Sequence, residues 1–458
     1  MSILRFSNDF ILGVATSAQQ IEGAWDEDGR GESIWDRYAA VAGKIEDGST
    51  PRTACDHYHR WREDVALLRW LGVGGYRFST SWSRVMPTGH GPPNPMGLDF
   101  YERLVDTLLE SGIEPFLTLN HWDMPQPLED RGGWPERAIC DAFTAYVDAV
   151  AGRLGDRVRF WATHNEPWCI ASLGYEQGAH APGRRNPQEA LEAAHHLLLS
   201  HGLGVERIRE LAPDAGVGIV LNLSPGRPAT STAADRDAVR QFDGFFNRWY
   251  LDPLFHGRYP DDAIADRVRW GHLPTERLRF VHDGDLARIG APLDFLGVNY
   301  YGGTVLAAGS DGKPRAVPPA PPEERTEMGW EIRPSGLLDL LERLARDGDV
   351  PPLYVTENGA AFADPSPQHG TIADPRRVAY LRDHLLAIHE AARRGVRLRG
   401  YFVWTLLDNF EWSHGFTKRF GLFGLDPCTG ERIPKDSAIW YRKTIADRAV
   451  DDEESLET

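Results

Sequence analysis

Short apolar runs rich in β-branched and aromatic residues recur along the chain, and amphipathic stretches with apolar residues three or four positions apart separate them. The apolar runs predict eight strands, over residues 10–15, 75–79, 115–119, 159–163, 217–221, 295–299, 353–356 and 401–405. The amphipathic stretches predict helices over residues 64–71, 100–111, 138–154, 190–211, 336–347 and 375–394. Strand and helix therefore alternate along the chain.

This alternation predicts an α/β protein built as a single (β/α)8 TIM barrel. Strands joined through helices run parallel and cross over right-handed, and near-continuous apolar strands are buried on both faces. A doubly wound open sheet is the alternative. We expect one barrel domain over residues 1–447 with elaborated βα loops, including a long irregular excursion over residues 307–333. The acidic, polar residues 448–458 are expected to form a disordered tail.

Composition and charge narrow the class of protein. The 458 residues are 41% hydrophobic and 26% charged, which is typical of a globular protein. The formal net charge of −17 repels phosphate polymers and anionic lipid, so neither nucleic acid nor a membrane is expected as a partner. Four cysteines lie far apart, without the spacing of a disulfide framework or a zinc site. No apolar run has the length of a signal or membrane segment, so a cytoplasmic location is expected.

Polar and aromatic side chains follow the predicted strands, and in a parallel barrel these positions share one end. They are Gln20, Glu22, Arg77, His121, Trp122, Asn165, Glu166, Asn299, Tyr301, Glu357, Asn358, Trp404, Asp408, Glu411 and Trp412. Carboxylates and amides pair with hydroxyl groups, and indole rings stack on the C–H faces of a sugar. A neutral sugar is therefore the expected ligand, with Glu166 and Glu357 facing each other as an acid and a nucleophile.

Several ordered motifs resemble those of the family 1 glycoside hydrolases, the retaining β-glucosidases and their relatives. The segment 163–167 (THNEP) resembles the acid/base motif of that family, and the segment 354–359 (YVTENG) resembles its nucleophile motif. The other similar segments are QIEG at 20–23, YRFS at 76–79, HWD at 121–123, VNYY at 298–301 and WTLLDNFEW at 404–412. Any one motif is a weak signal, whereas their co-occurrence in the family's order over most of the chain is specific.

The resemblance implies a double displacement. Glu357 attacks the anomeric carbon while Glu166 protonates the leaving oxygen, and water activated by Glu166 then hydrolyses the glycosyl ester with net retention. This chemistry requires the two carboxyl groups to lie roughly 5–5.5 Å apart. Arg77 and Tyr301 would hold Glu357 as an anion, and Asn299 would belong to the same catalytic group. The charge on Glu357 would favour a proton on Glu166 until Glu357 is esterified.

The resemblance also implies a set of sugar contacts and no metal or other cofactor. The substrate-binding residues would be Gln20, His121, Trp122, Asn165, Trp330, Trp404, Glu411 and Trp412. Trp168 and Asn222 are expected on the aglycone side, with Trp330 as a second candidate wall there. A charged Glu411 would repel a 6-phosphate, which disfavours the phospho-glycosidase branch of the family.

Asn120 and His164 depart from the family's pattern, because apolar or aromatic residues usually stand there. They occupy equivalent places on the third and fourth predicted strands. Our hypothesis is that they form a hydrogen-bonded pair behind the wall of the site and thereby position His121 and Asn165.

The expected activity is that of a retaining exo-β-glycosidase which removes terminal non-reducing β-D-glucosyl residues from aryl or alkyl glucosides or cello-oligosaccharides, as in cellulose degradation. A β-galactosidase, β-fucosidase or transglycosidase of the same family is the alternative. A non-catalytic sugar-binding barrel would lack one carboxylate, and a phosphosugar isomerase or aldolase would need a basic phosphate pocket. The oligomeric state stays open.

Overall fold

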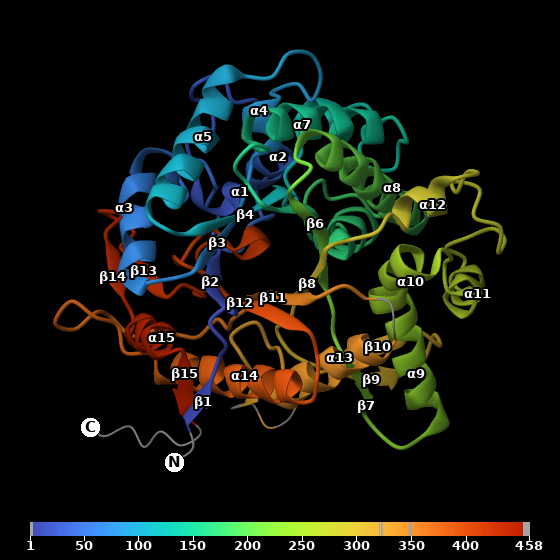
Figure 1. The fold of residues 1–458 in the computed structure, drawn as a ribbon. Coiled ribbons are helices and arrows are strands. Elements are labelled where there is room, and N and C mark those ends of the chain that lie inside the picture. Colours follow the sequence, from blue (N-terminus) through green and yellow to red (C-terminus); the bar gives the residue numbers. More distant parts are fainter. Residues whose placement is uncertain (1–2, 320, 322–323, 348–349, 452–458) are drawn as a thin grey trace.

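The computed structural model describes residues 3–319, 321, 324–347 and 350–451, and eight of its strands close into a parallel barrel (Figure 1). In chain order the barrel strands are β2 (Ile11–Ala15), β3 (Gly75–Ser79), β4 (Glu114–Asn120), β5 (Phe160–Asn165), β6 (Gly216–Asn222), β8 (Phe295–Asn299), β11 (Leu353–Asn358) and β12 (Leu398–Trp404). Parallel pairing of β12 with β2 closes the ring. All eight predicted strands are confirmed, and the open-sheet alternative is wrong.

Six helices confirm the predicted amphipathic stretches and cover the outside of the barrel (Figure 1). They are α3 (His57–Leu71), α5 (Pro95–Glu110), α7 (Ile139–Leu154), α8 (Pro187–Leu211), α13 (Pro334–Arg346) and α14 (Pro375–Arg393). Helix α3 begins before the predicted residue 64 because Tyr58 and Trp61 in its first turns are buried against the barrel. Within the described ranges, none of the helices is both long enough and apolar enough to cross a membrane.

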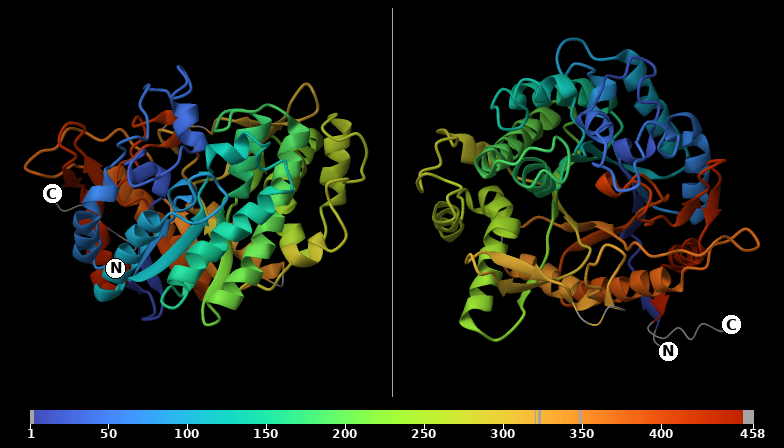
Figure 2. Two further views of the ribbon diagram at one scale, coloured as in Figure 1. Left: turned by 90° about the horizontal axis from the view of Figure 1, so that it is seen from above. Right: turned by 180° about the vertical axis from the view of Figure 1, so that it is seen from behind.

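Further elements follow or interrupt the barrel loops, and one of them, α15 (Asp436–Asp447), packs against α14 and α3 on the outside of the barrel (Figures 1 and 2). The helices are α1 (Ala18–Ile21), α2 (Ile34–Ala39), α4 (Trp82–Val85), α6 (Gln126–Glu129), α9 (Ala233–Asp243), α10 (Trp249–His256), α11 (Asp261–Arg269), α12 (Asp285–Ile289) and α15 (Asp436–Asp447). Two π-helices, η1 (Cys169–Glu176) and η2 (Gly244–Arg248), and the 3₁₀ turn η4 (Trp412–His414) complete them. Strands β13 (Phe423–Leu425) and β14 (Arg432–Pro434) form a small antiparallel pair.

The excursion predicted as irregular over residues 307–333 is partly regular, which corrects that expectation. Strand β9 (Thr304–Ala308) pairs with β10 (Pro314–Val317) and with β7 (Gly226–Pro228) in a separate sheet. Leu306 of β9 packs with Ala238 and Phe242 of α9. Residues 305–308 (VLAA) of β9 are a short apolar run, but β7 (GRP) and β10 (PRAV) have none, so the apolar pattern does not reveal this sheet.

The acidic tail begins later than the predicted residue 448. Strand β15 (Ala449–Asp451) pairs antiparallel with β1 (Ile3–Arg5), and the Phe6 N–H donates to the Arg448 carbonyl at 2.8 Å. Val450 is buried between these strands and α14. Residues 452–458 lie outside the described residues, so the prediction of disorder there stays a prediction.

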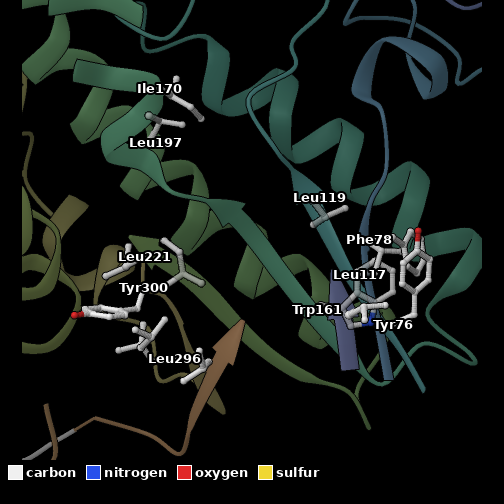
Figure 3. Close-up of a cluster of buried hydrophobic side chains, with 14 of the residues drawn as sticks. Tyr76, Phe78, Leu117, Leu119, Trp161, Ile170, Leu197, Leu221, Leu296 and Tyr300 are labelled. Atoms are coloured by element: carbon white, nitrogen blue, oxygen red, sulfur yellow. The ribbon is translucent and has the colours of Figure 1, made fainter. Parts of the chain in front are cut away.

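Strand alternation divides the core into two layers. Side chains that point outward, including Tyr76, Leu117 and Trp161, pack under the helices in one large cluster (Figure 3). Their neighbours along the strands, including Phe116 and Phe402, point inward and fill the barrel interior. Because Arg77 lies between the outward residues Tyr76 and Phe78, its side chain enters the barrel and reaches toward the carboxyl ends of the strands.

Candidate active site

A cavity of about 580 Å³ opens at the carboxyl end of the barrel strands. Twelve of the predicted site residues line it: His121, Trp122, Glu166, Trp168, Asn222, Asn299, Tyr301, Trp330, Glu357, Trp404, Glu411 and Trp412. The other three, Gln20, Arg77 and Asn165, are fully buried behind the wall and hydrogen-bond to residues that line the cavity. Glu22, Asn358 and Asp408, which the sequence also places after the strands, do not line the cavity. Glu22 pairs with Arg84, Asn358 hydrogen-bonds to the Tyr300 carbonyl, and Asp408 accepts from Lys435.

Irregular strand register turns both key carboxyl groups toward the cavity. On β5 the pairing with β6 shifts between Ala162 and Asn165, so Thr163 and His164 both contact α8, at His201 and Ser200. A regular strand would send these consecutive side chains to opposite faces. On β11 the pairing with β8 shifts between Val355 and Glu357. Such irregularities re-aim the side chains that follow them, here Asn165 with Glu166, and Glu357.

Three residues of the cavity wall adopt a backbone conformation that L-residues rarely adopt. The φ angles are +49° for Glu166, +71° for Trp122 and +52° for Trp412. A left-handed conformation in residues this large is unfavourable and persists only when the surrounding structure holds it in place. Its occurrence at three sites around one cavity marks this end of the barrel as the functional end.

Glu357 is held by cationic and hydroxyl donors. Arg77 donates from Nη1 to Oε1 at 2.5 Å, and the Tyr301 hydroxyl donates to Oε2 at 2.5 Å. Both Arg77 and Glu357 are almost completely buried, with side-chain exposures of 2% and 3%. Burial raises the pKa of Glu357, while Arg77 and Tyr301 oppose that rise by stabilising the carboxylate. The anion is therefore better supported here than at the neighbouring Glu166.

Glu166 has neutral hydrogen-bond partners instead. Asn299 donates from Nδ2 to Oε1 at 2.6 Å, and the Cys169 thiol donates to Oε2 at 3.0 Å. Burial, with the negative charge of Glu357 as a further cause, raises the pKa of Glu166 to about 7. Of the two carboxyl groups, Glu166 is thus the one that holds a proton near neutral pH.

Two amides connect the carboxyl groups. Asn299 Nδ2 also donates to Asn165 Oδ1 at 3.0 Å, and its Oδ1 accepts from Thr356 Oγ1 at 2.7 Å. Arg77 donates from Nη2 to the same Asn165 oxygen at 2.6 Å. A continuous network therefore runs from the guanidinium that holds Glu357 to the amide that holds Glu166.

The deep end of the cavity combines indole rings with Glu411. His121 stacks between Trp404 and Trp412, with ring centroids 5.6 and 6.0 Å apart, and Gln20 donates to Glu411 Oε2 at 3.3 Å. Burial, reinforced by the charge on Glu357, raises the pKa of Glu411 to about 8. This rise weakens the charge of Glu411 near neutral pH, and the expectation that this residue repels a phosphate stays a prediction.

A different feature argues against an anionic ligand. Among the described residues that line the cavity, none is Lys or Arg. A bound phosphate would therefore lack a direct cationic partner, and Arg77 is already engaged by Glu357 and Asn165.

The outer part of the cavity is aromatic. Trp168 packs on Phe246 with ring centroids 4.4 Å apart, and Trp330 packs on Tyr301 at 5.2 Å. Trp330 is 36% exposed, so its face is available at the mouth. Asn222, at the end of β6, also lines this part.

The hypothesis of an Asn120–His164 pair is wrong as a direct contact. The residues are register partners on β4 and β5, but Asn120 Oδ1 accepts from the Trp122 N–H at 2.9 Å. His164 Nε2 lies 2.9 Å from Ser200 Oγ, and that hydroxyl donates to a carbonyl of α8. The register shift on β5 turns His164 toward α8, which strand alternation alone does not anticipate.

The sequence reasoning missed several cavity residues, which are Cys169, Leu173, His180, Phe246, Met328 and Phe420. Cys169 had a usable signal, because it stands three residues after Glu166 at the start of a helical segment, and residues so spaced share a face. Leu173 lies on the same helical segment, four residues after Cys169, and the remaining residues come from segments distant in the sequence, whose course the pattern does not reveal. Across the described chain, no group of three or more His, Cys, Asp or Glu side chains is arranged to hold a metal ion.

A (β/α)8 barrel with two buried carboxyl groups, one held by an arginine and a tyrosine and the other by neutral partners, over an aromatic cavity defines a glycoside hydrolase. The model of the family described as glycosyl hydrolase family 1 matches residues 3–450, and the chain belongs to this family.

The relatives are similar to this chain over nearly its full length. The chain is 46% identical to beta-glucosidase A of Acetivibrio thermocellus, over 97% of this chain and 99% of that protein. It is 44% identical to a bifunctional beta-D-glucosidase/beta-D-fucosidase of Bifidobacterium breve, over 97% and 99%. The solved family 1 β-glucosidase of Thermotoga maritima superposes with a TM-score of 0.94 at 41% identity, covering 99% of this chain and 100% of that one.

Proposed function

We propose that this protein is a retaining β-glucosidase that releases the terminal non-reducing glucosyl residue of aryl or alkyl β-glucosides and cello-oligosaccharides. The observation that carries the proposal is the contrast between two buried carboxyl groups in one network. Arg77 and Tyr301 support the anion at Glu357, and amide and thiol partners leave Glu166 with a pKa of about 7.

In the first step Glu357 attacks the anomeric carbon and Glu166 gives its proton to the departing oxygen. Arg77 keeps the attacking carboxylate ionised and oriented, since its two donors bind Glu357 and Asn165 at once. The protonated Glu166 makes the leaving group an alcohol instead of an alkoxide, a contribution of roughly 10²–10⁴-fold in rate. The C–O bond breaks as the glycosyl ester of Glu357 forms.

In the second step water attacks the anomeric carbon and gives a proton to Glu166, while the bond between that carbon and the Glu357 oxygen breaks and frees the carboxylate. Esterification removes the charge of Glu357, which is one of the two causes of the raised pKa of Glu166. The pKa of Glu166 therefore falls when a base is needed, and two inversions give net retention.

The closed deep end of the cavity suits a chain terminus. Gln20 is fully buried there and Glu411 is 9% exposed, so the cavity stops at these side chains. Protonated Glu411 is both a donor and an acceptor for sugar hydroxyls, and Trp404 offers an indole face. This arrangement supports two groups of sugar contacts. The glycone would bind to Gln20, His121, Trp122, Asn165, Trp404, Glu411 and Trp412. The aglycone would bind to Trp168, Asn222 and Trp330.

A β-fucoside is the second candidate substrate. The relative from Bifidobacterium breve is named as a glucosidase and fucosidase. A β-D-fucosyl residue differs from a glucosyl residue in two ways, because it lacks the 6-hydroxyl and its 4-hydroxyl is axial, so two polar contacts at the deep end change. Comparing kcat/KM for aryl β-glucoside, β-fucoside and β-galactoside ranks the three.

The test of the proposal uses Glu357→Ala and Glu166→Ala with an activated aryl β-glucoside. Each variant is expected to lose at least about 10³-fold in turnover, and azide is expected to restore product formation. Azide replaces the nucleophile in Glu357→Ala and gives the α-glucosyl azide. It replaces water in Glu166→Ala and gives the β-glucosyl azide, which separates the two roles.

The control is Glu114→Gln, because Glu114 begins β4 at the opposite end of the barrel and is half-buried. It should keep wild-type turnover. Normal turnover by Glu357→Ala, or release of α-glucose as the first product of the wild type, would overturn the proposal.

A reducing compartment, the cytoplasm, is the proposed location. Cys55, Cys140 and Cys169 are buried free thiols, and Cys428 is an exposed one. An exposed thiol without a partner is typical of proteins kept in a reducing environment. Cell fractionation against cytoplasmic and exported marker proteins tests this location.

A further inference from the structure

We propose that the Cys169 thiol is a positioning residue for Glu166: it donates a hydrogen bond that stabilises the ionised state and so prepares Glu166 to act as the base of the second step. The inference rests on the proposed role of Glu166. It assigns to a cysteine in the cavity wall a part in the acid-to-base switch.

The geometry places the thiol hydrogen on the carboxyl group. Cys169 Sγ lies 3.0 Å from Glu166 Oε2, and the Cys169 side chain is buried. Asn222 Nδ2 donates to the same sulfur at 3.6 Å, from the end of β6. Because the sulfur accepts from Asn222, its own hydrogen is free to point at Glu166. The π-helix η1 begins at Cys169 and holds the thiol against the carboxyl group.

The thiol acts as a donor and not as a nucleophile. Burial raises the pKa of Cys169 well above its ordinary value, and the nearby negative charge of Glu166 adds to the rise. Cys169 therefore stays protonated through the range in which the acid/base works. A neutral S–H is a weak donor, which yields easily when Oε2 itself takes up a proton.

The two oxygens of Glu166 differ in consequence. Oε1 is held by the Asn299 amide at 2.6 Å, whereas Oε2 has only the thiol. The exchangeable proton of Glu166 therefore belongs on Oε2. The charged and titratable groups around Glu166 are Glu357, Arg77, Tyr301 and Glu411, and none of these donates a hydrogen bond to Oε2.

The test compares Cys169→Ala and Cys169→Ser in the pH profile of kcat/KM for an aryl β-glucoside with a poor leaving group. The alkaline limb of this profile reports the pKa of Glu166 in the free enzyme, because the first step needs its protonated form. Removing a donor to the carboxylate raises its pKa, so Cys169→Ala should move this limb upward by about 0.5–1 pH unit. Cys169→Ser keeps a donor and should leave the limb at or below the wild-type position.

The same variants should also change the second step. With an activated leaving group, breakdown of the glycosyl ester limits kcat and requires ionised Glu166, so the acid limb of kcat should move upward in Cys169→Ala. Cys140→Ala is the matched control, because Cys140 is also a buried thiol but donates to the His196 carbonyl, away from the cavity. Thermal unfolding shows that each variant is folded.

An alkaline limb in Cys169→Ala that is unchanged or lower would overturn the inference, as would an equal upward shift in Cys169→Ser or in Cys140→Ala. Failure of the proposed function is distinguishable, because the alkaline limb would then persist in Glu166→Ala. If the alkaline limb disappears in Glu166→Ala but keeps its wild-type pH in Cys169→Ala, the proposed function stands and only the role of the thiol fails.

Discussion

Tyr301 and Arg77 hold the two oxygens of one carboxylate from opposite sides. Tyr301 donates to Oε2 of Glu357 and Arg77 donates to Oε1. Burial raises the pKa of Tyr301 well above its ordinary value, so this hydroxyl stays a donor at every working pH. Each residue therefore stabilises the anion independently, and the loss of one should weaken the nucleophile without abolishing it.

Tyr301→Phe should move the acid limb of kcat/KM to higher pH. The hydroxyl lowers the pKa of Glu357, so its removal raises that pKa and the anion is lost at a higher pH on the acid side. A hydrogen bond to a charged group contributes roughly 1.5–3 kcal/mol, so kcat/KM at pH 6 should fall about 10–100-fold. Tyr300→Phe is the control, since the Tyr300 hydroxyl donates to the Arg333 carbonyl outside the cavity. Equal losses in both variants would argue against a role at Glu357.

At the scale of elements, β15 (Ala449–Asp451) pairs with β1 (Ile3–Arg5) and so links the last described residues to the first. It pairs with β1 at three register positions, and Arg448 donates from Nη2 to the Phe10 carbonyl at 2.6 Å. Phe10 directly precedes the barrel strand β2 (Ile11–Ala15). The last described strand and Arg448 therefore stabilise the segment that leads into the first barrel strand.

Truncation after Arg448 should be less stable than truncation after Asp451. The shorter chain loses the buried Val450 and the strand hydrogen bonds to β1. Burial of one valine contributes roughly 1.5–3 kcal/mol and each hydrogen bond about 0.5–1.5 kcal/mol, so a difference of about 2–4 kcal/mol is expected. Urea unfolding of the two truncated proteins measures it. Equal urea midpoints for the two truncated proteins would show that β15 does not stabilise the barrel.

At the scale of the whole molecule, several histidines are buried in the neutral form. Burial lowers the pKa of His195 to about 4, that of His201 to about 3 and that of His384 to about 4. All three side chains are inaccessible to solvent. In the unfolded chain a histidine titrates near 6.5, so the unfolded state binds more protons between these values.

The stability that these three histidines contribute should therefore fall as the pH drops from 6.5 toward 4, whereas Glu166 and Glu411, with their raised pKa values, contribute in the opposite direction. The folded pKa of each histidine is depressed, so its contribution is complete above about 6.5 and is lost on acidification, by about 1.4 kcal/mol per pH unit for each group. Urea unfolding at pH 7, 6 and 5 measures the slope. His384→Gln should reduce the slope between pH 6 and 5 by about 1 kcal/mol per unit. An unchanged slope in His384→Gln would contradict this interpretation of the buried histidines.

Much of the fold and of the candidate site followed from local pattern. The barrel strand β8 (Phe295–Asn299) coincides with the predicted range, because a strand buried on both faces is a nearly continuous apolar run. In β3 (Gly75–Ser79) the aromatic residues Tyr76 and Phe78 carry the signal around the buried Arg77. The site residues follow these strands, so their positions along the chain already placed them at one end of the barrel. Short strands without an apolar run, such as β7 (Gly226–Pro228) and β10 (Pro314–Val317), carry no such signal.

Contacts between distant segments depended on the folded chain. The register shift on β5 sent His164 toward Ser200 and away from Asn120. Burial raised the pKa of Glu411 to about 8, a property of its surroundings and not of its residue type. The pattern of apolar and polar residues reports only on local structure, over a few helical turns or a single strand. Hydrogen bonds, dielectric surroundings and proton affinities arise from groups that meet only when the barrel closes.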